Sequence, residues 1–176
     1  MLKKFCVQDL ILIAALAAIG IAIKPIVGPI VKMISTPLGI PGGSFAGGFY
    51  MMWLVLAMMI VGKGGTGTIF GILQAIGVMI FPFAGNQGAI SLITYTVPGL
   101  LADLIFFLFV YRRHLAAHLL ICALANMTGA VLSAVLIFRH PPLILIGIAS
   151  IALASGIVGG YLSYSIYISL KKMRII

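Results

Sequence analysis

The chain has 176 residues, of which 63% are hydrophobic and only 7% are charged, and its mean hydropathy is +1.30. Soluble domains carry about 25% charged residues, so this composition excludes a soluble globule and a disordered chain. Two cysteines are too few for a disulfide-stapled secreted scaffold. The net charge of +9 comes from basic residues that lie between apolar runs. In that position they are expected to orient the helices in a bilayer, and no nucleic-acid partner is expected. We therefore expect an all-α integral membrane protein.

Six apolar stretches, each near the length that crosses a bilayer, predict a single domain over residues 1–176, a six-transmembrane-helix bundle. The predicted spans are Phe5–Ile23, Ser44–Val61, Thr66–Phe81, Gly88–Tyr111, Leu115–Phe138 and Leu143–Leu170. Most of the lysines and arginines lie in the termini and in the connections on the same side of the membrane as the termini. Basic residues favour the cytoplasmic side, so both termini are predicted to be cytoplasmic. The first span also resembles a signal peptide, but we expect it to be retained. The predicted location is the plasma membrane of a prokaryotic cell.

The first connection, Lys24–Gly43, is long and rich in proline and glycine. This composition favours a bent, movable lid on the outer side of the membrane. The connection Pro82–Gln87 adds a polar tip with Asn86 at the same surface. Together they could close a site from outside, or they could be two ordinary outer turns.

Polar side chains within the spans are the candidates for function, because each costs free energy in lipid unless it has a partner or lines a wet cavity. Asp103 is the only acid near the middle of a span. It could contact a ligand, or it could make a structural hydrogen bond to a neighbouring helix; both interpretations stay open. Gln74 and Asn126 lie near the middles of the third and fifth spans and could offer polar edges to a ligand.

Aromatic residues add a possible stacking surface. Tyr50 and Trp53 are three residues apart and so share a helix face, where they could stack on a planar ring or simply pack. Pro98 removes a backbone hydrogen bond in the fourth span, so the segment Thr94–Gly99, which includes Tyr95, is predicted as a pocket wall or an ordinary kink.

The sequence contains no phosphate-binding glycine loop and no nucleophile elbow. We therefore expect no enzymatic activity and no cofactor, with any ATP hydrolysis on partner subunits. His114, His118 and Cys122 share one face of the fifth span, but no further cysteine or acid is placed to complete a metal shell. No metal site is expected.

Small residues form two stripes that permit close helix contact in lipid. One comprises Ala14, Ala18 and Ala22 in the first span; the other comprises Ala152, Gly156 and Gly160 in the sixth. Packing within the bundle would account for either stripe, and one of them could instead face a partner protein.

Several motifs resemble those of a known family, the substrate-binding S components of energy-coupling factor vitamin transporters. The motifs are Gly48-Phe49-Tyr50-Met51-Met52-Trp53, Gly62-Lys63-Gly64-Gly65, Gly85-Asn86-Gln87-Gly88, Pro98-Gly99-Leu100-Leu101-Ala102-Asp103 and the alanine stripe of the first span. They are most like the hydroxymethylpyrimidine/thiamine-type members. Those relatives carry Glu in the fourth helix where this chain has Asp103. Nickel and cobalt members begin Met-His, whereas this chain begins Met1-Leu2.

The resemblance implies an ABC-type importer subunit that captures a vitamin or vitamin precursor from outside. Delivery would need a transmembrane coupling protein, contacted through Ala14, Ala18 and Ala22, and two cytoplasmic ATPases. The expected substrate-binding residues are Tyr50, Trp53, Gln74, Asn86, Tyr95, Asp103 and Asn126.

Two rival interpretations remain. The outer lysines and Arg139 would steer an anionic vitamin better than a cation. Alternatively, the chain could be a membrane scaffold or accessory subunit with no ligand.

Overall fold

The computed structural model describes residues 5–38, 40, 42–81, 88–108 and 114–174. These residues form helices and turns, and no strand occurs among them. The α-helices are α1 (Val7–Ala22), α2 (Lys24–Ser35), α3 (Gly42–Val61), α4 (Thr66–Ile80), α5 (Ile90–Leu108), α6 (Leu115–Leu136) and α7 (Pro142–Lys172), with a short 3-10 helix, η1, at Thr36–Leu38. The all-α prediction is confirmed.

Four helices are long and apolar enough to cross a membrane in the part of the chain that the structure describes: α3, α5, α6 and α7. The pair α1 and α2, bent by 42° at Ile23, would make a fifth span. Helix α4 is apolar but has only 15 residues. Four to five spans are thus supported, while six spans and cytoplasmic termini stay predictions.

The predicted lid loop Lys24–Gly43 is wrong for most of its length, because residues 24–35 are helical. Pro25 lies in the first turn, where its missing N–H would have no partner within the helix anyway. Pro29 lies inside the helix, where it leaves only one backbone carbonyl without its usual donor. Apolar residues at helical spacing outweigh these breaks, so proline content overstated the irregularity of this segment.

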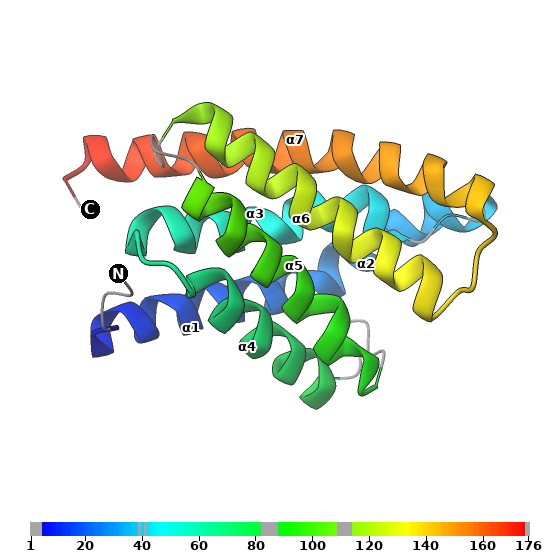
Figure 1. Ribbon diagram of the computed structural model, residues 1–176, viewed down its shortest axis with the longest axis horizontal. Helices are drawn as coiled ribbons and strands as arrows, with labels where there is room; N and C mark the ends of the chain where they lie inside the picture. Colours follow the sequence, from blue (N-terminus) through cyan, green and yellow to red (C-terminus); the bar gives the residue numbers. More distant parts are fainter. Residues whose placement is uncertain (1–4, 39, 41, 82–87, 109–113, 175–176) are drawn as a thin grey trace.

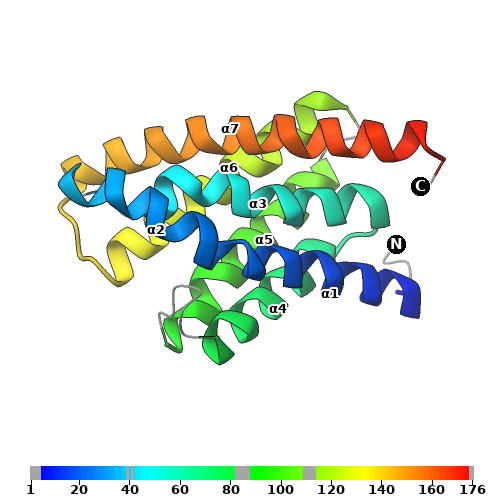
Figure 2. The ribbon, with the colours of Figure 1, turned by 180° about the vertical axis from the view of Figure 1, so that it is seen from behind.

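Helices α3, α6 and α7 pack with their backbones in close contact. A β-carbon at Gly48 would overlap the backbone of Ser155 and Gly156, and one at Gly159 would overlap Gly48 itself. Gly156 and Gly160 approach the α6 backbone in the same manner. The small-residue stripe of the sixth predicted span therefore serves internal packing. Figures 1 and 2 show α7 running along the length of the molecule beside α3 and α6.

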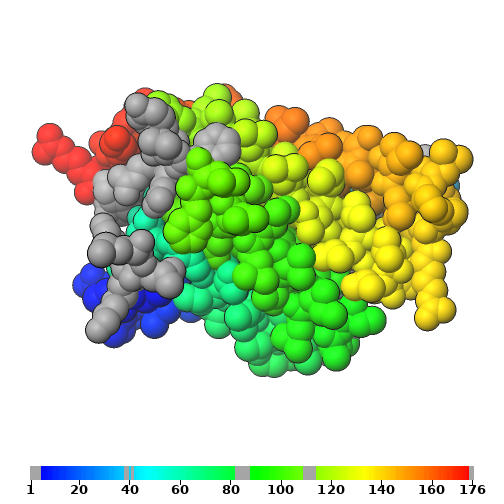
Figure 3. Space-filling model, in the orientation of Figure 1, coloured from blue at the N-terminus to red at the C-terminus, as the bar shows by residue number. Residues whose placement is uncertain are grey.

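Helices α4 and α5 form a second close pair, in which Gly67 faces Gly99 and Gly71 faces the backbone of Tyr95. Helix α1 covers α3 and α4 with its buried residues Ile13, Ala17 and Gly20. The side chains of α5 and α6 fill much of the face seen in Figure 3. These contacts form the apolar core, which includes Leu54, Met58 and Phe106.

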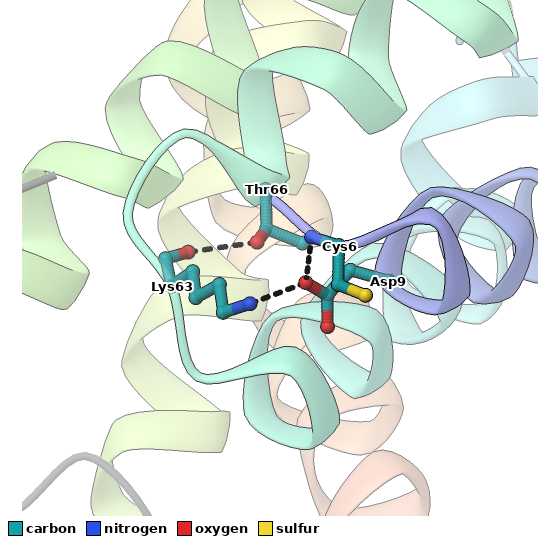
Figure 4. A network of polar contacts seen from close by, with 4 residues as sticks. All are labelled: Cys6, Asp9, Lys63 and Thr66. Atoms are coloured by element: carbon teal, nitrogen blue, oxygen red, sulfur yellow. Dashed lines mark hydrogen bonds and ion pairs between the residues drawn. The ribbon is translucent and has the colours of Figure 1, made fainter. Parts of the chain in front are cut away.

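Both termini lie at one end of the bundle (Figure 1). There, Lys63 in the α3–α4 turn forms an ion pair with Asp9 of α1. The same carboxylate accepts a hydrogen bond from the Cys6 backbone N–H at 2.7 Å, and the Thr66 hydroxyl donates to the Lys63 carbonyl at 2.7 Å (Figure 4). This network ties the start of α1 to the start of α4.

Candidate functional site

A cavity of about 580 Å³ lies toward the end of the bundle away from the termini. Helices α2, α3, α4, α5 and α6 all contribute to its wall. Six glycines line the wall: Gly28, Gly42, Gly43, Gly47, Gly71 and Gly129. A β-carbon at Gly28 or Gly43 would meet no atom within 4 Å, so these two glycines keep space open. Its volume is within the range of small-molecule binding pockets, which is roughly 300–1,000 Å³.

Lys24 is the most unusual residue of this cavity, because it is only 6% exposed yet carries an ammonium group. Its Nζ donates a hydrogen bond to the Gln74 side-chain oxygen at 3.0 Å and another to the Tyr95 hydroxyl at 3.1 Å. The ammonium also lies over the Tyr95 ring, 4.2 Å from its centroid, and 5.7 Å from that of Tyr50. All of these partners are neutral groups.

The bend at Ile23 explains how Lys24 comes to be buried. Helix α1 ends at Ala22 and α2 begins at Lys24, so the change of direction carries the first side chain of α2 into the bundle. Figure 2 shows α2 leaving the line of α1 and lying against the start of α3. On the opposite side of α2, Ile26, Ile30 and Met33 are exposed. Helix α2 therefore covers the cavity with its polar and glycine-bearing side.

Four of the predicted substrate-binding residues line this cavity: Tyr50, Gln74, Tyr95 and Asn126. They come from α3, α4, α5 and α6, so the fold brings together side chains far apart in the sequence. Thr94 also lines the cavity, as expected for the predicted wall segment. The remaining three behave differently. Asn86 lies outside the described residues, and Trp53 and Asp103 are not in the cavity wall.

Trp53 packs instead against the apolar core, and its indole lies beside Gly20 of α1. The indole N–H is buried, and none of the described residues offers it a hydrogen-bond acceptor. The expected stacking face is therefore divided, since Tyr50 faces the cavity while Trp53 faces α1.

Asp103 accepts hydrogen bonds from the first turn of α4. Its Oδ1 accepts a hydrogen bond from the Gly67 N–H at 3.0 Å, and its Oδ2 accepts from the Thr68 N–H at 2.8 Å and from the Thr68 hydroxyl at 2.7 Å. The residue that precedes α4 is Gly65, which has no side chain to cap the helix. Asp103 thus caps α4 from the neighbouring helix, and its charge lies at the positive end of the helix dipole.

Two polar atoms of the cavity wall have spare hydrogen-bonding capacity. The Ser44 hydroxyl is fully buried and has no hydrogen-bond partner among the described residues. The Asn126 amide nitrogen donates to the Ala152 carbonyl at 2.8 Å, which leaves its Oδ1 facing Gly47. Buried polar groups are normally satisfied, so these atoms mark where a ligand or ordered water would bind.

No group of three or more His, Cys, Asp or Glu side chains is placed to hold a metal ion within the described ranges. His118 Nδ1 lies 3.1 Å from the Ser163 hydroxyl, and the Cys122 thiol donates to the Gly48 carbonyl at 3.7 Å. Both residues therefore join α6 to its neighbours, α7 and α3.

The alanine stripe of α1 lies on the side away from the bundle. Ala14, Ala18 and Ala22 are exposed, whereas Ala17 and Gly20 are buried against α3 and α4. An exposed strip of small residues permits close approach of another helix. Whether it binds a partner stays a prediction.

Lys24 was the residue that sequence reasoning placed wrongly, as part of an outer loop. One signal could have found it: the alternation of Lys24, Gly28 and Val31 against Ile26, Ile30 and Met33 predicts an amphipathic helix, with the lysine on the inner face. The proline residues masked that pattern.

No curated protein and no solved structure matches the chain. A family model described as the permease component of the ABC-type cobalt transport system matches residues 8–132, which include four of the five helices that form the cavity and most of the fifth. The chain belongs to this family of ABC-type transport permease components.

Proposed function

We propose that the chain is the substrate-binding subunit of an energy-coupling factor importer and that it captures a small organic molecule in the cavity beneath α2. The cavity carries this proposal, because a scaffold subunit would not need a cavity of this size lined by aromatic and amide side chains. Family membership supports a role in ABC-type transport.

The family description names cobalt, but the cavity wall is poorly suited to a bare divalent cation. Its lining contains no histidine, cysteine or acid among the described residues, and these are the side chains that ligate transition metals. It contains instead the buried ammonium of Lys24, which would repel a metal ion. An organic substrate fits this wall better.

Hydroxymethylpyrimidine and thiamine are the substrates suggested by the sequence resemblance. The rings of Tyr50 and Tyr95 and the amide oxygen of Asn126 would suit a polar heterocycle. Thiamine carries a fixed positive charge, which Lys24 disfavours, whereas the neutral pyrimidine has no such conflict. An anionic vitamin is the alternative substrate class.

Transport would require partners that the chain does not contain. We propose that a coupling protein binds the exposed stripe of Ala14, Ala18 and Ala22, and that two cytoplasmic ATPases supply the energy. In this proposal α1 and α2 form one bent span, α4 completes the six, and both termini are cytoplasmic.

Uptake of labelled substrates tests the role. Cells that express the chain with a coupling protein and ATPases should accumulate one of the labelled vitamins or precursors, and cells lacking the chain should not. The variant Gly28→Leu should abolish this uptake, because a β-carbon at Gly28 meets no atom within 4 Å and the longer side chain would occupy the cavity.

The matched control is Gly147→Leu. Gly147 is exposed on α7, and a β-carbon there also meets no atom within 4 Å. Unchanged uptake by Gly28→Leu would contradict binding in this cavity. Loss of uptake by both variants would mean that the added leucine impairs helix insertion. The experiment would then give no support for binding in the cavity.

A further inference from the structure

We infer that the cavity binds the carboxylate of a small organic acid and that Lys24 is the residue that selects it. This inference rests on the proposed function, since it assumes that the cavity holds a substrate, and it adds the chemical class of that substrate.

The charge balance of the chain favours an anionic ligand. The whole sequence contains two acidic residues, Asp9 and Asp103. Asp9 is paired with Lys63 at the end of the bundle that holds the termini, and Asp103 accepts three hydrogen bonds from Gly67 and Thr68. Neither acid is among the hydrogen-bond or ion-pair partners of Lys24. No acidic side chain of this chain therefore supplies a countercharge to the buried ammonium.

The hydrogen bonds of Lys24 do not use all of its donors. An ammonium group has three protons, and two of them are given to Gln74 and Tyr95. Because Lys24 lines the cavity, the third is available to a molecule inside it. Burial of a charge without an opposite charge is costly, so an anionic ligand would gain the attraction without the full cost of desolvating the lysine at the moment of binding.

The same wall contains an independent donor. The Ser44 hydroxyl is fully buried, lines the cavity and has no hydrogen-bond partner in the part of the chain that the structure describes. Hydroxyl and ammonium groups both donate to carboxylate oxygens, and such charge-assisted hydrogen bonds are stronger than neutral ones. The other cation of the wall, Lys32, is exposed. One buried positive charge matches a single negative charge, which favours a carboxylate over a phosphate dianion.

The test compares acids with uncharged analogues of nearly the same shape. Binding of nicotinate, biotin and pantothenate to the purified full chain in nanodiscs is measured against binding of nicotinamide, biotinamide and pantothenol, with hydroxymethylpyrimidine and thiamine as neutral and cationic probes. We expect at least one acid to bind at least tenfold more tightly than its uncharged analogue and than both pyrimidine probes.

Substitution of the lysine should remove that preference. Lys24→Met should weaken binding of the acid at least thirtyfold while leaving the weak binding of its analogue unchanged, and Lys24→Gln serves as a second variant that keeps hydrogen-bonding capacity. Without ligand, Lys24→Met should unfold at the same or a higher temperature than the unsubstituted protein, because it removes a buried charge. The control Lys172→Met removes an exposed charge from the last turn of α7 and should bind the acid normally.

Four results would overturn the inference. Equal binding of an acid and its analogue would do so, as would tight binding of the acid by Lys24→Met. Tight binding of hydroxymethylpyrimidine or thiamine, with no acid bound, would overturn the anionic class while preserving the proposed transport role. If none of the probes binds and no molecule in a cell extract stabilises the protein, the proposed function fails together with the inference.

Discussion

Asp103 and Lys24 are both buried charged residues in a bundle that has few of them, yet the structure treats them in opposite ways. Asp103 accepts three hydrogen bonds from the first turn of α4. Lys24 donates to two neutral side chains and lies beside open space. The first charge is satisfied by the fold itself, whereas the second has only neutral hydrogen-bond partners among the described residues. A polar residue in a membrane helix is therefore informative about function only once its partners are known.

The glycines also fall into two groups, one at helix contacts and one beside the cavity. Gly48, Gly67 and Gly99 allow backbones to touch, and a β-carbon at any of them would overlap a neighbouring backbone. Gly28 and Gly43 border the cavity, and a β-carbon at either meets no atom within 4 Å. One set closes the bundle and the other keeps a space open. The predictions below test this division, beginning with the largest expected effect.

Gly48→Leu should prevent stable folding. The added side chain would overlap the backbone of Ser155, which cannot move without separating α3 from α7. Overpacking of this kind typically costs 1–3 kcal/mol and more when backbone must shift, so we expect a loss of about 3 kcal/mol or more. The yield of monodisperse protein and its unfolding temperature in detergent measure the effect. Gly147→Leu is again the control, and equal behaviour of the two variants would contradict the close helix contact.

Asp103→Ala should destabilise the protein without altering ligand selectivity. It leaves the N–H groups of Gly67 and Thr68 without an acceptor at the start of α4. Loss of a charged acceptor from buried donors predicts a decrease of about 3 kcal/mol in the free energy of unfolding. Thermal unfolding measures the first effect and ligand binding at a permissive temperature the second. A change in which ligand binds would show that Asp103 also serves the cavity.

Thr68→Val removes only the hydroxyl contact with Asp103 and keeps both backbone hydrogen bonds. We expect a decrease in unfolding free energy of about 1 kcal/mol, the usual value for one hydrogen bond. The comparison with Asp103→Ala separates the hydroxyl from the helix cap. A loss as large as that of Asp103→Ala would mean that the backbone hydrogen bonds contribute little.

Gly28→Ala should have the smallest effect, and its sign should be opposite. Alanine at this helical position reduces the freedom of the unfolded chain and adds a methyl group to open space, which predicts stabilisation of about 0.5–1 kcal/mol. Unfolding temperature without ligand measures it. Destabilisation would indicate that α2 needs the flexibility of glycine at this position.

The sequence was sufficient to predict the helical class, because apolar runs of this length have few alternatives in a bilayer. Four of the residues expected to bind substrate line the cavity, since polar side chains within spans tend to face the interior: Tyr50, Gln74, Tyr95 and Asn126. That they bind a substrate stays a prediction. The proline content of residues 24–43 led to the wrong prediction of a loop.

The roles of Asp103 and Lys24 could not have been separated from the sequence. Both are charged residues in apolar surroundings, and their difference depends on which helix each one faces. Asp103 is 36 residues from Gly67, and Lys24 is 71 residues from Tyr95. Only the packing of α4 against α5, and the bend between α1 and α2, bring these partners together.

The central claim is that the cavity beneath α2 holds a small organic substrate. Native mass spectrometry of the purified full chain tests this claim most directly. After incubation with an extract of small molecules, the unsubstituted protein should retain one organic molecule per chain, released on activation and identified by its mass, while Gly28→Leu should retain none and Gly147→Leu should behave normally. Retention of nothing by the unsubstituted protein, or of the same molecule by Gly28→Leu, would contradict the account.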